Sequence, residues 1–92
     1  MNKTQKFSSV WDALEDDPIK AENMKLRSTL MMAITARIDK EDVTQTAIAE
    51  ILGITQPRVS ALKQGKIELF RLDTLVDMAH RLGLQVSIDI AA

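Results

Sequence analysis

Residues 44–65 of the chain read TQTAIAEILGITQPRVSALKQG, and this stretch decides the fold. It begins with the pattern of a short helix, which Gly53 interrupts, and Pro57 then stands in the first turn of a second helical pattern. Glycine reaches positive φ without steric cost, so a helix that turns sharply can end there. Proline is tolerated in a first helical turn, where its missing N–H costs little. The sequence therefore predicts two short helices, over about 45–52 and 56–64, that cross at a steep angle.

The apolar residues of this stretch predict how the two helices pack. Ala49 is small enough for a close approach, and the expected core consists of Ile48, Leu52, Ile54, Val59 and Leu62. This packing leaves a polar outer face on the second helix, made of Gln56, Pro57, Ser60, Lys63 and Gln64, with Arg58 beside them. Such a face suits the major groove of DNA, because glutamine can pair with adenine, and arginine or lysine with guanine or phosphate. We also expect Thr55 to cap the second helix through its hydroxyl and to belong to the same DNA-contacting surface.

The charge distribution points to the same stretch. The 92-residue chain has a net charge of −1, and residues 1–42 and 67–92 sum to −1 and −2. Residues 43–66 sum to +2, because Arg58, Lys63 and Lys66 stand against Glu50 alone. A local positive surface can contact phosphates even when the whole molecule is acidic.

The sequence before this stretch predicts an N-terminal helical extension over 8–39. Ser8 or Ser9 can cap a short first helix, which Pro18 ends. Asp17 is expected to cap a long second helix that runs to about Ile38. Its apolar stripe consists of Met24, Leu26, Leu30, Met31, Ile34 and Ile38, and Met32 and Met78 are also expected in the core.

The sequence after it predicts a last helix over about 72–82, which Gly83 ends, and then a strand over 84–90. In that strand Leu84, Val86, Ile88 and Ile90 alternate with polar residues. No second strand of this quality is present, and a single strand leaves its backbone groups unpaired. The expected partner is the same strand of a second copy, antiparallel across a two-fold axis. The long N-terminal helix remains open as the alternative dimer contact.

Several classes of protein are not expected. The chain has no cysteine, which excludes disulfides and thiolate sites. No apolar run is long enough for a membrane helix, and the N-terminus lacks the apolar core of a secretory signal, so a cytoplasmic protein is predicted. His80 is the only histidine and lacks ligand or acid partners at useful spacing, so we predict no metal, no cofactor and no enzymatic activity. Residues 1–92 are predicted to form one domain.

The motif at 44–66 resembles the helix-turn-helix of XRE-type repressors. The matching residues are Ala49, Gly53, Ile54, Val59 and Leu62, with Gln45 opening the first helix and Gln56 the second. Residues 46–88 resemble more narrowly the small HigA-like antitoxins, and the long helix with KLRSTLMMAI fits that group. The resemblance implies an all-α, five-helix, lambda-repressor-like domain with a short C-terminal strand.

The resemblance also implies roles for single residues. Gln45 would brace a phosphate and Gln56, which would read a base. Arg58 and Ser60 would make further base or phosphate contacts, and Lys63, Gln64 and Lys66 would hold the backbone of the DNA. Two positions depart from the family pattern. Pro57 replaces a small hydrogen-bonding residue and can only touch a thymine methyl, and Arg71 stands where a Ser or Thr cap is expected, with Asp73 as a substitute.

The implied function is a sequence-specific repressor whose dimer binds an inverted repeat, with half-sites about 34 Å apart. Likeness to HigA adds a second role, which is to neutralise a RelE/HigB-like toxin and repress the shared operon. The apolar residues Phe7, Val10, Trp11 and Leu14 either pack on the protein's own bundle or contact a partner subunit or toxin. The competing interpretation is an interaction module that binds another protein and never DNA.

Overall fold

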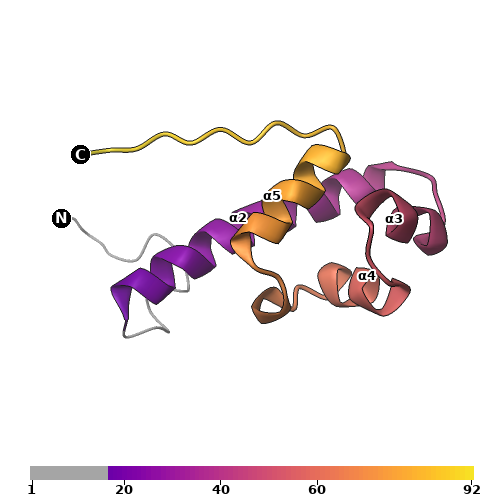
Figure 1. Ribbon diagram of the computed structural model, residues 1–92, viewed down its shortest axis with the longest axis horizontal. Coiled ribbons are helices and arrows are strands. Elements are labelled where there is room, and N and C mark those ends of the chain that lie inside the picture. The colour runs from indigo at the N-terminus through magenta and orange to yellow at the C-terminus, as the bar shows by residue number, and fades with distance from the viewer. Residues whose placement is uncertain (1–16) are drawn as a thin grey trace.

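The computed structural model describes residues 17–92, and within them it contains four α-helices and one 3₁₀ turn. The elements are α2 (Pro18–Lys40), α3 (Gln45–Leu52), α4 (Gln56–Lys63), η1 (Ile67–Leu69) and α5 (Leu72–Arg81). Figure 1 shows α5 against the middle of the long α2, with α3 and α4 together beyond one end of α5. The prediction of an all-α domain is confirmed for this part of the chain. The predicted short helix before Asp17 lies outside the described residues.

Helix α2 starts and ends where local chemistry predicts. The Asp17 carboxylate accepts hydrogen bonds from the backbone N–H groups of Ile19 and Lys20, at 3.0 and 3.5 Å, and Pro18 occupies the first helical position. At the other end the N–H of Glu41 donates to the carbonyl of Ile38 at 3.1 Å. The helix has 23 residues, so it is about 34 Å long, and it packs against α4, η1 and α5.

A single hydrophobic core joins all the described helices. Its buried members include Met31, Ile34 and Ile38 of α2, Ile48, Ala49 and Leu52 of α3, Val59 and Leu62 of α4, and Leu75 and Met78 of α5. Ile54 packs against it from the turn, as predicted. Two predicted core residues are exposed instead, Leu26 by 47% and Met32 by 65%. Met31 and Met32 are neighbours in a helix, about 100° apart around its axis, so the turn that buries one carries the other toward solvent.

The connection between α4 and α5 contains a core residue that the sequence reasoning missed. Gly65, with φ of +75°, ends α4, and η1 follows with Ile67 buried. Phe70, just after η1, is completely buried and is the largest fully buried side chain among the described residues. This aromatic ring therefore fixes the path of the chain between the two helices.

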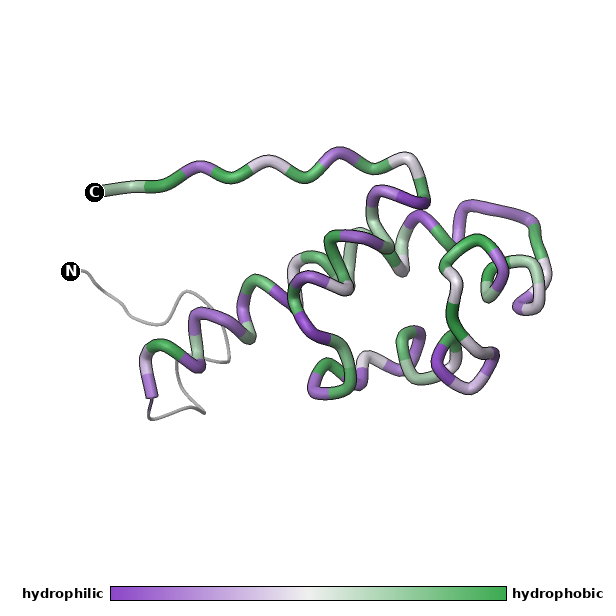
Figure 2. Tube along the Cα trace, in the orientation of Figure 1, coloured by the Kyte–Doolittle hydropathy of each residue, from purple (hydrophilic) through white to green (hydrophobic). Residues whose placement is uncertain are grey.

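The last helix ends as predicted, but the predicted strand over 84–90 is wrong for the single chain. Gly83 has φ of +79°, and the N–H of Leu84 donates to the carbonyl of Ala79 at 2.9 Å, which closes α5. The residues beyond Leu84 are extended, yet no β-ladder forms in the described chain. A strand needs a hydrogen-bonded neighbour, and Figures 1 and 2 show this segment, with its alternating hydropathy, turning back past α5 with no strand beside it. Pairing with a second copy stays a prediction.

Candidate nucleic-acid interface

The bend between α3 and α4 is built by Gly53. Its φ of +70° lies in the left-handed region, and its N–H donates to the carbonyl of Glu50 at 3.3 Å. The N–H of Ile54 then donates to the carbonyl of Ala49 at 3.0 Å. These bonds satisfy carbonyl groups that a helix end leaves unpaired. The prediction of a glycine-made corner is confirmed.

The two short helices begin in different ways. The Thr44 hydroxyl accepts a hydrogen bond from the N–H of Ala47 at 3.1 Å, which caps α3. Thr55 holds the same position in α4, but its side chain makes no capping bond, so that prediction is wrong. Proline at 57 has no N–H to offer, and the N–H of Arg58 donates to the Thr55 carbonyl at 3.1 Å instead. The hydroxyl of this exposed threonine therefore keeps its capacity for an outside partner.

The outer face of α4 is polar and accessible, and we call it the reading face. It consists of Gln56, Pro57, Ser60, Lys63 and Gln64, with Thr55 before the helix and Lys66 after it. Of these only Ser60 is partly buried, and Gln45 of α3 is partly buried beside it. The opposite side of α4 is buried through Val59, Ala61 and Leu62, which anchor the helix to the core. Of the residues predicted to face outward, Gln56, Pro57, Lys63 and Gln64 are exposed, whereas Ser60 is only partly so.

Two side-chain hydrogen bonds tie the start of α3 to α4. The Gln45 amide donates to the Ser60 hydroxyl at 3.1 Å, and the Gln56 amide donates to the Thr46 hydroxyl at 3.0 Å. The bracing of Gln56 by Gln45 that the family resemblance implies is thus absent from the unbound chain. Thr46 is a site residue that sequence reasoning missed, since nothing in the local pattern marks it. Each amide keeps its carbonyl oxygen and one N–H for another partner, and the bond that it makes limits its rotation.

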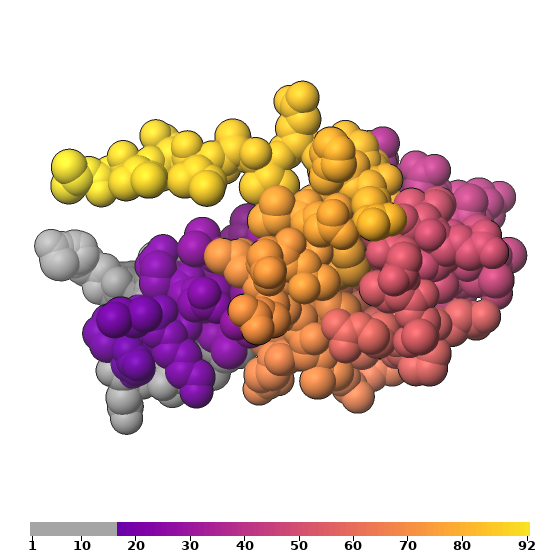
Figure 3. All heavy atoms as spheres, in the orientation of Figure 1, coloured from indigo at the N-terminus to yellow at the C-terminus, as the bar shows by residue number. Residues whose placement is uncertain are grey.

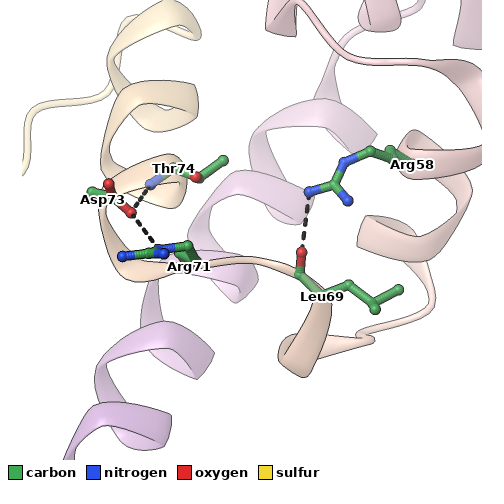
Figure 4. Close-up of polar contacts among 5 residues, drawn as sticks. All are labelled: Arg58, Leu69, Arg71, Asp73 and Thr74. Atoms are coloured by element: carbon green, nitrogen blue, oxygen red, sulfur yellow. Dashed lines mark hydrogen bonds and ion pairs between the residues drawn. The ribbon is translucent and has the colours of Figure 1, made fainter.

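Arg58 points away from the reading face and holds the loop that follows α4. Its guanidinium donates to the backbone carbonyl of Leu69 at 3.0 Å and lies 4.6 Å from the centre of the Phe70 ring. Figure 4 shows this bond beside a second cluster, in which the Asp73 carboxylate accepts from the N–H of Thr74. Arg58 is partly buried by these contacts. The structure therefore assigns Arg58 a structural bond, and contact with DNA remains a prediction for this residue.

The start of α5 departs from ordinary capping, as the sequence indicated. Arg71 stands at the N-cap position and its side chain makes no capping hydrogen bond. Asp73 lies in the first turn, where it accepts the bond from Thr74 at 2.9 Å and lies 3.7 Å from the Arg71 guanidinium. The Asp73 carboxylate, and not the side chain at the N-cap position, therefore accepts a backbone hydrogen bond in the first turn of α5.

The positive charge near the reading face is not neutralised by ion pairs. In the described part of the chain, ion pairs such as Arg37–Glu41 and Arg81–Asp77 lie elsewhere. Lys63 and Lys66 are exposed and take part in none of them. Two ammonium groups at the C-terminal end of α4 thus remain available to phosphates.

The remaining predicted site residues fall into two groups. Leu84 packs against the core, whereas Val86, Ile88 and Ile90 are exposed. The residues suggested for a toxin or partner contact, Phe7, Val10, Trp11 and Leu14, lie outside the described residues.

Metal sites and membrane spans can be assessed within residues 17–92. No group of three or more His, Cys, Asp or Glu side chains there could hold a metal ion, and His80 is exposed. None of the helices in that range combines the length and apolar character needed to cross a bilayer.

Comparison with known proteins places this geometry in a class. Residues 13–91 match the model of a helix-turn-helix domain family, and the chain belongs to that family. A solved structure provisionally assigned to the XRE family of transcriptional regulators is similar, with 37% sequence identity and a TM-score of 0.73. The similarity covers 79% of this chain and 82% of that chain. A search of curated proteins found no match.

Proposed function

We propose that this protein is a sequence-specific DNA-binding transcriptional repressor of the XRE type that works in the cytoplasm. The observation that carries the proposal is the reading face, a polar and basic helix surface held outward by a buried apolar side. Membership of a helix-turn-helix family and likeness to the XRE-family structure support it.

In this proposal α4 enters the major groove and its N-terminal residues meet the base edges. Gln56 offers a carbonyl oxygen and an N–H, the pair of groups that matches adenine. Lys63 and Lys66 neutralise phosphates on the flanking backbone, and Ser60 and Gln45, which are hydrogen-bonded to each other, supply further polar contacts. A two-fold dimer places two such helices about 34 Å apart on an inverted repeat, and it represses transcription by occupying the promoter.

The first test selects preferred duplexes from a random library and then measures mobility shifts with Gln56→Ala. We expect a loss of about 1–3 kcal/mol in binding free energy, together with relaxed preference at one base position. Asn23→Ala is the control, because it removes a side-chain amide of α2 that lies outside both the reading face and residues 84–90. If no sequence is enriched and the parent binds no duplex, the interaction-module interpretation replaces this one.

The second test measures how affinity for the selected duplex depends on salt. Lys63→Ala should reduce the log–log slope by about 0.9, because one phosphate contact is lost. Lys40→Ala removes an exposed lysine at the end of α2 and should leave the slope unchanged. Equal slopes for both variants and the parent would place the phosphate contacts elsewhere.

We further propose that the repressor is the antitoxin of a RelE/HigB-like toxin and regulates their shared operon. The support is the resemblance of residues 46–88 to HigA-like antitoxins, together with apolar surface available on α2, where Ile19 is 82% exposed. The neighbouring reading frame should then encode a small basic protein that is lethal alone and co-purifies with this chain. A harmless neighbour that does not co-purify would remove the toxin role and leave the repressor role intact.

A further inference from the structure

The segment after Leu84 has strand chemistry without a strand's partner. The last backbone hydrogen bond of the described chain is the one that Leu84 donates to Ala79, and every residue beyond it is exposed. Ile88 and Ile90 are 83% and 85% exposed, and Figure 3 shows the end of the segment standing clear of the helices. Unpaired backbone groups beside exposed isoleucines form a template for another strand.

The base of this segment runs along an apolar groove. Leu26 and Leu30 of α2 and Val76 of α5 line it, together with Val86 and Ile88 of the segment, and its volume is about 230 Å³. The groove is poorly filled, since Leu26 and Val76 remain 47% and 40% exposed. A two-stranded ribbon placed here would cover the groove with its apolar face and turn its polar face to water, as antiparallel sheets commonly do.

We infer that the occupant is the same segment of a second copy, paired antiparallel with the two-fold axis through Ser87. This inference supplies the dimer that the proposed repressor needs, and it rests on the proposed function in that respect. The sequence LQVSIDI, residues 84–90, is symmetric about Ser87 in its order of apolar and polar residues. A symmetric pattern allows each copy to match the other with every apolar side chain on one face.

The matching selects one register among the possible ones. With the axis at Ser87, Leu84 meets Ile90 of the second copy, Val86 meets Ile88, and Gln85 meets Asp89. With the axis at Asp89, two carboxylates face each other, which is destabilising. With the axis at Ile88, Leu84 meets the small side chain of Ala92. The register at Ser87 is the one that pairs all four large apolar residues with one another.

Single cysteines test this register, because the chain has no cysteine of its own. In Ser87→Cys the two Cα atoms lie directly opposite, about 4.5–5.5 Å apart, within the range of a disulfide. We expect oxidation without DNA to convert most of this variant to a covalent dimer. Gln85→Cys and Asp89→Cys should not cross-link alone, since identical residues then lie about 14 Å apart. Mixed together, these two variants should cross-link, and all three positions are exposed, so folding is not disturbed.

Three results would overturn the inference. The parent could sediment as a monomer at all concentrations, Ile88→Cys could cross-link in place of Ser87→Cys, or a dimer could persist without any cross-link in the segment. A failure of this dimer inference can be told apart from a failure of the proposed repressor function. Cross-linking needs no DNA, so its absence alongside a clear Gln56→Ala effect removes this dimer only. Cross-linking with no DNA binding removes the repressor only.

Discussion

The corner between α3 and α4 and the segment after Leu84 differ in where their partners lie. Both have clear sequence patterns, of helical and period-two type. In the corner, the capping carbonyls, the hydroxyl of Thr44 and the apolar contacts of Val59 all come from the same chain. In the segment, no backbone group beyond Leu84 has a partner within the described residues.

The difference follows from how the two structures form hydrogen bonds. A helix pairs each N–H with a carbonyl four residues earlier, so a local pattern suffices to predict it. A strand pairs only with a neighbour about 4.8 Å away, which can belong to another molecule. A sequence pattern thus predicts a helix and its caps directly. For a strand, it predicts only that a second strand must pair with it. The corner is therefore expected to be stable within one chain, whereas the segment needs a second one.

The largest expected effect lies at the support of the corner. Phe70→Ala removes a fully buried ring and should lower the free energy of unfolding by about 3–5 kcal/mol in urea titration. Leu69→Ala is the control. Leu69 is the residue before Phe70 and is 51% exposed, so its truncation should lower the free energy of unfolding far less. Similar losses for the two variants would mean that the ring is not the anchor of the α4–α5 connection.

The bend itself should be the next most sensitive point. Gly53→Ala places a Cβ on a residue with φ of +70° and should cost about 1–2 kcal/mol from left-handed strain. The new Cβ would lie 3.5 Å from the Arg81 guanidinium, an ordinary contact, so strain and not collision sets the cost. Glu50→Ala, an exposed change one turn earlier in α3, should stay within about 0.5 kcal/mol. Equal unfolding midpoints for the parent and Gly53→Ala would contradict the left-handed bend.

The two threonine positions sharpen the comparison inside the corner. Thr44→Ala removes a hydroxyl that accepts the N–H of Ala47 and should cost about 1 kcal/mol. Thr55→Ala removes a hydroxyl that makes no capping bond, so its unfolding free energy should stay close to that of the parent. Thermal unfolding of both variants is the measurement, and a larger cost for Thr55→Ala would restore it as a cap.

Much of the fold could be predicted from local chemistry. The helix over 45–52 and the start of the next at Gln56 are confirmed, because Gly53 and Pro57 mark them and their apolar residues share one core. The stops at Gly53 and Gly83 are also confirmed, since both glycines take positive φ.

What could not be predicted depends on contacts between distant residues. Arg58 donates to the carbonyl of Leu69, eleven residues later, and the types of these two residues do not predict that bond. The cross-helix bond from Gln56 to Thr46 is similar, because it exists only once the corner has closed. The exposure of Gln56, Pro57, Lys63 and Gln64 could therefore be predicted from the sequence, whereas the hydrogen bonds among the site residues could not.

The smallest expected effect on folding concerns the segment after Leu84. Changing Ile88→Ser and Ile90→Ser together should alter the unfolding free energy of the dilute monomer by no more than about 0.5 kcal/mol, because both side chains are exposed. The same variant should lose the rise in unfolding temperature with protein concentration that a dimer shows, because oligomers are stabilised by mass action. Val76→Ser is the companion variant, since it removes an apolar side chain from the groove itself, and it should act in the same way. A loss above about 1 kcal/mol in the dilute double variant would show that the segment packs on its own helices. The corner and the segment would then both be completed within one chain, and the contrast between them would disappear.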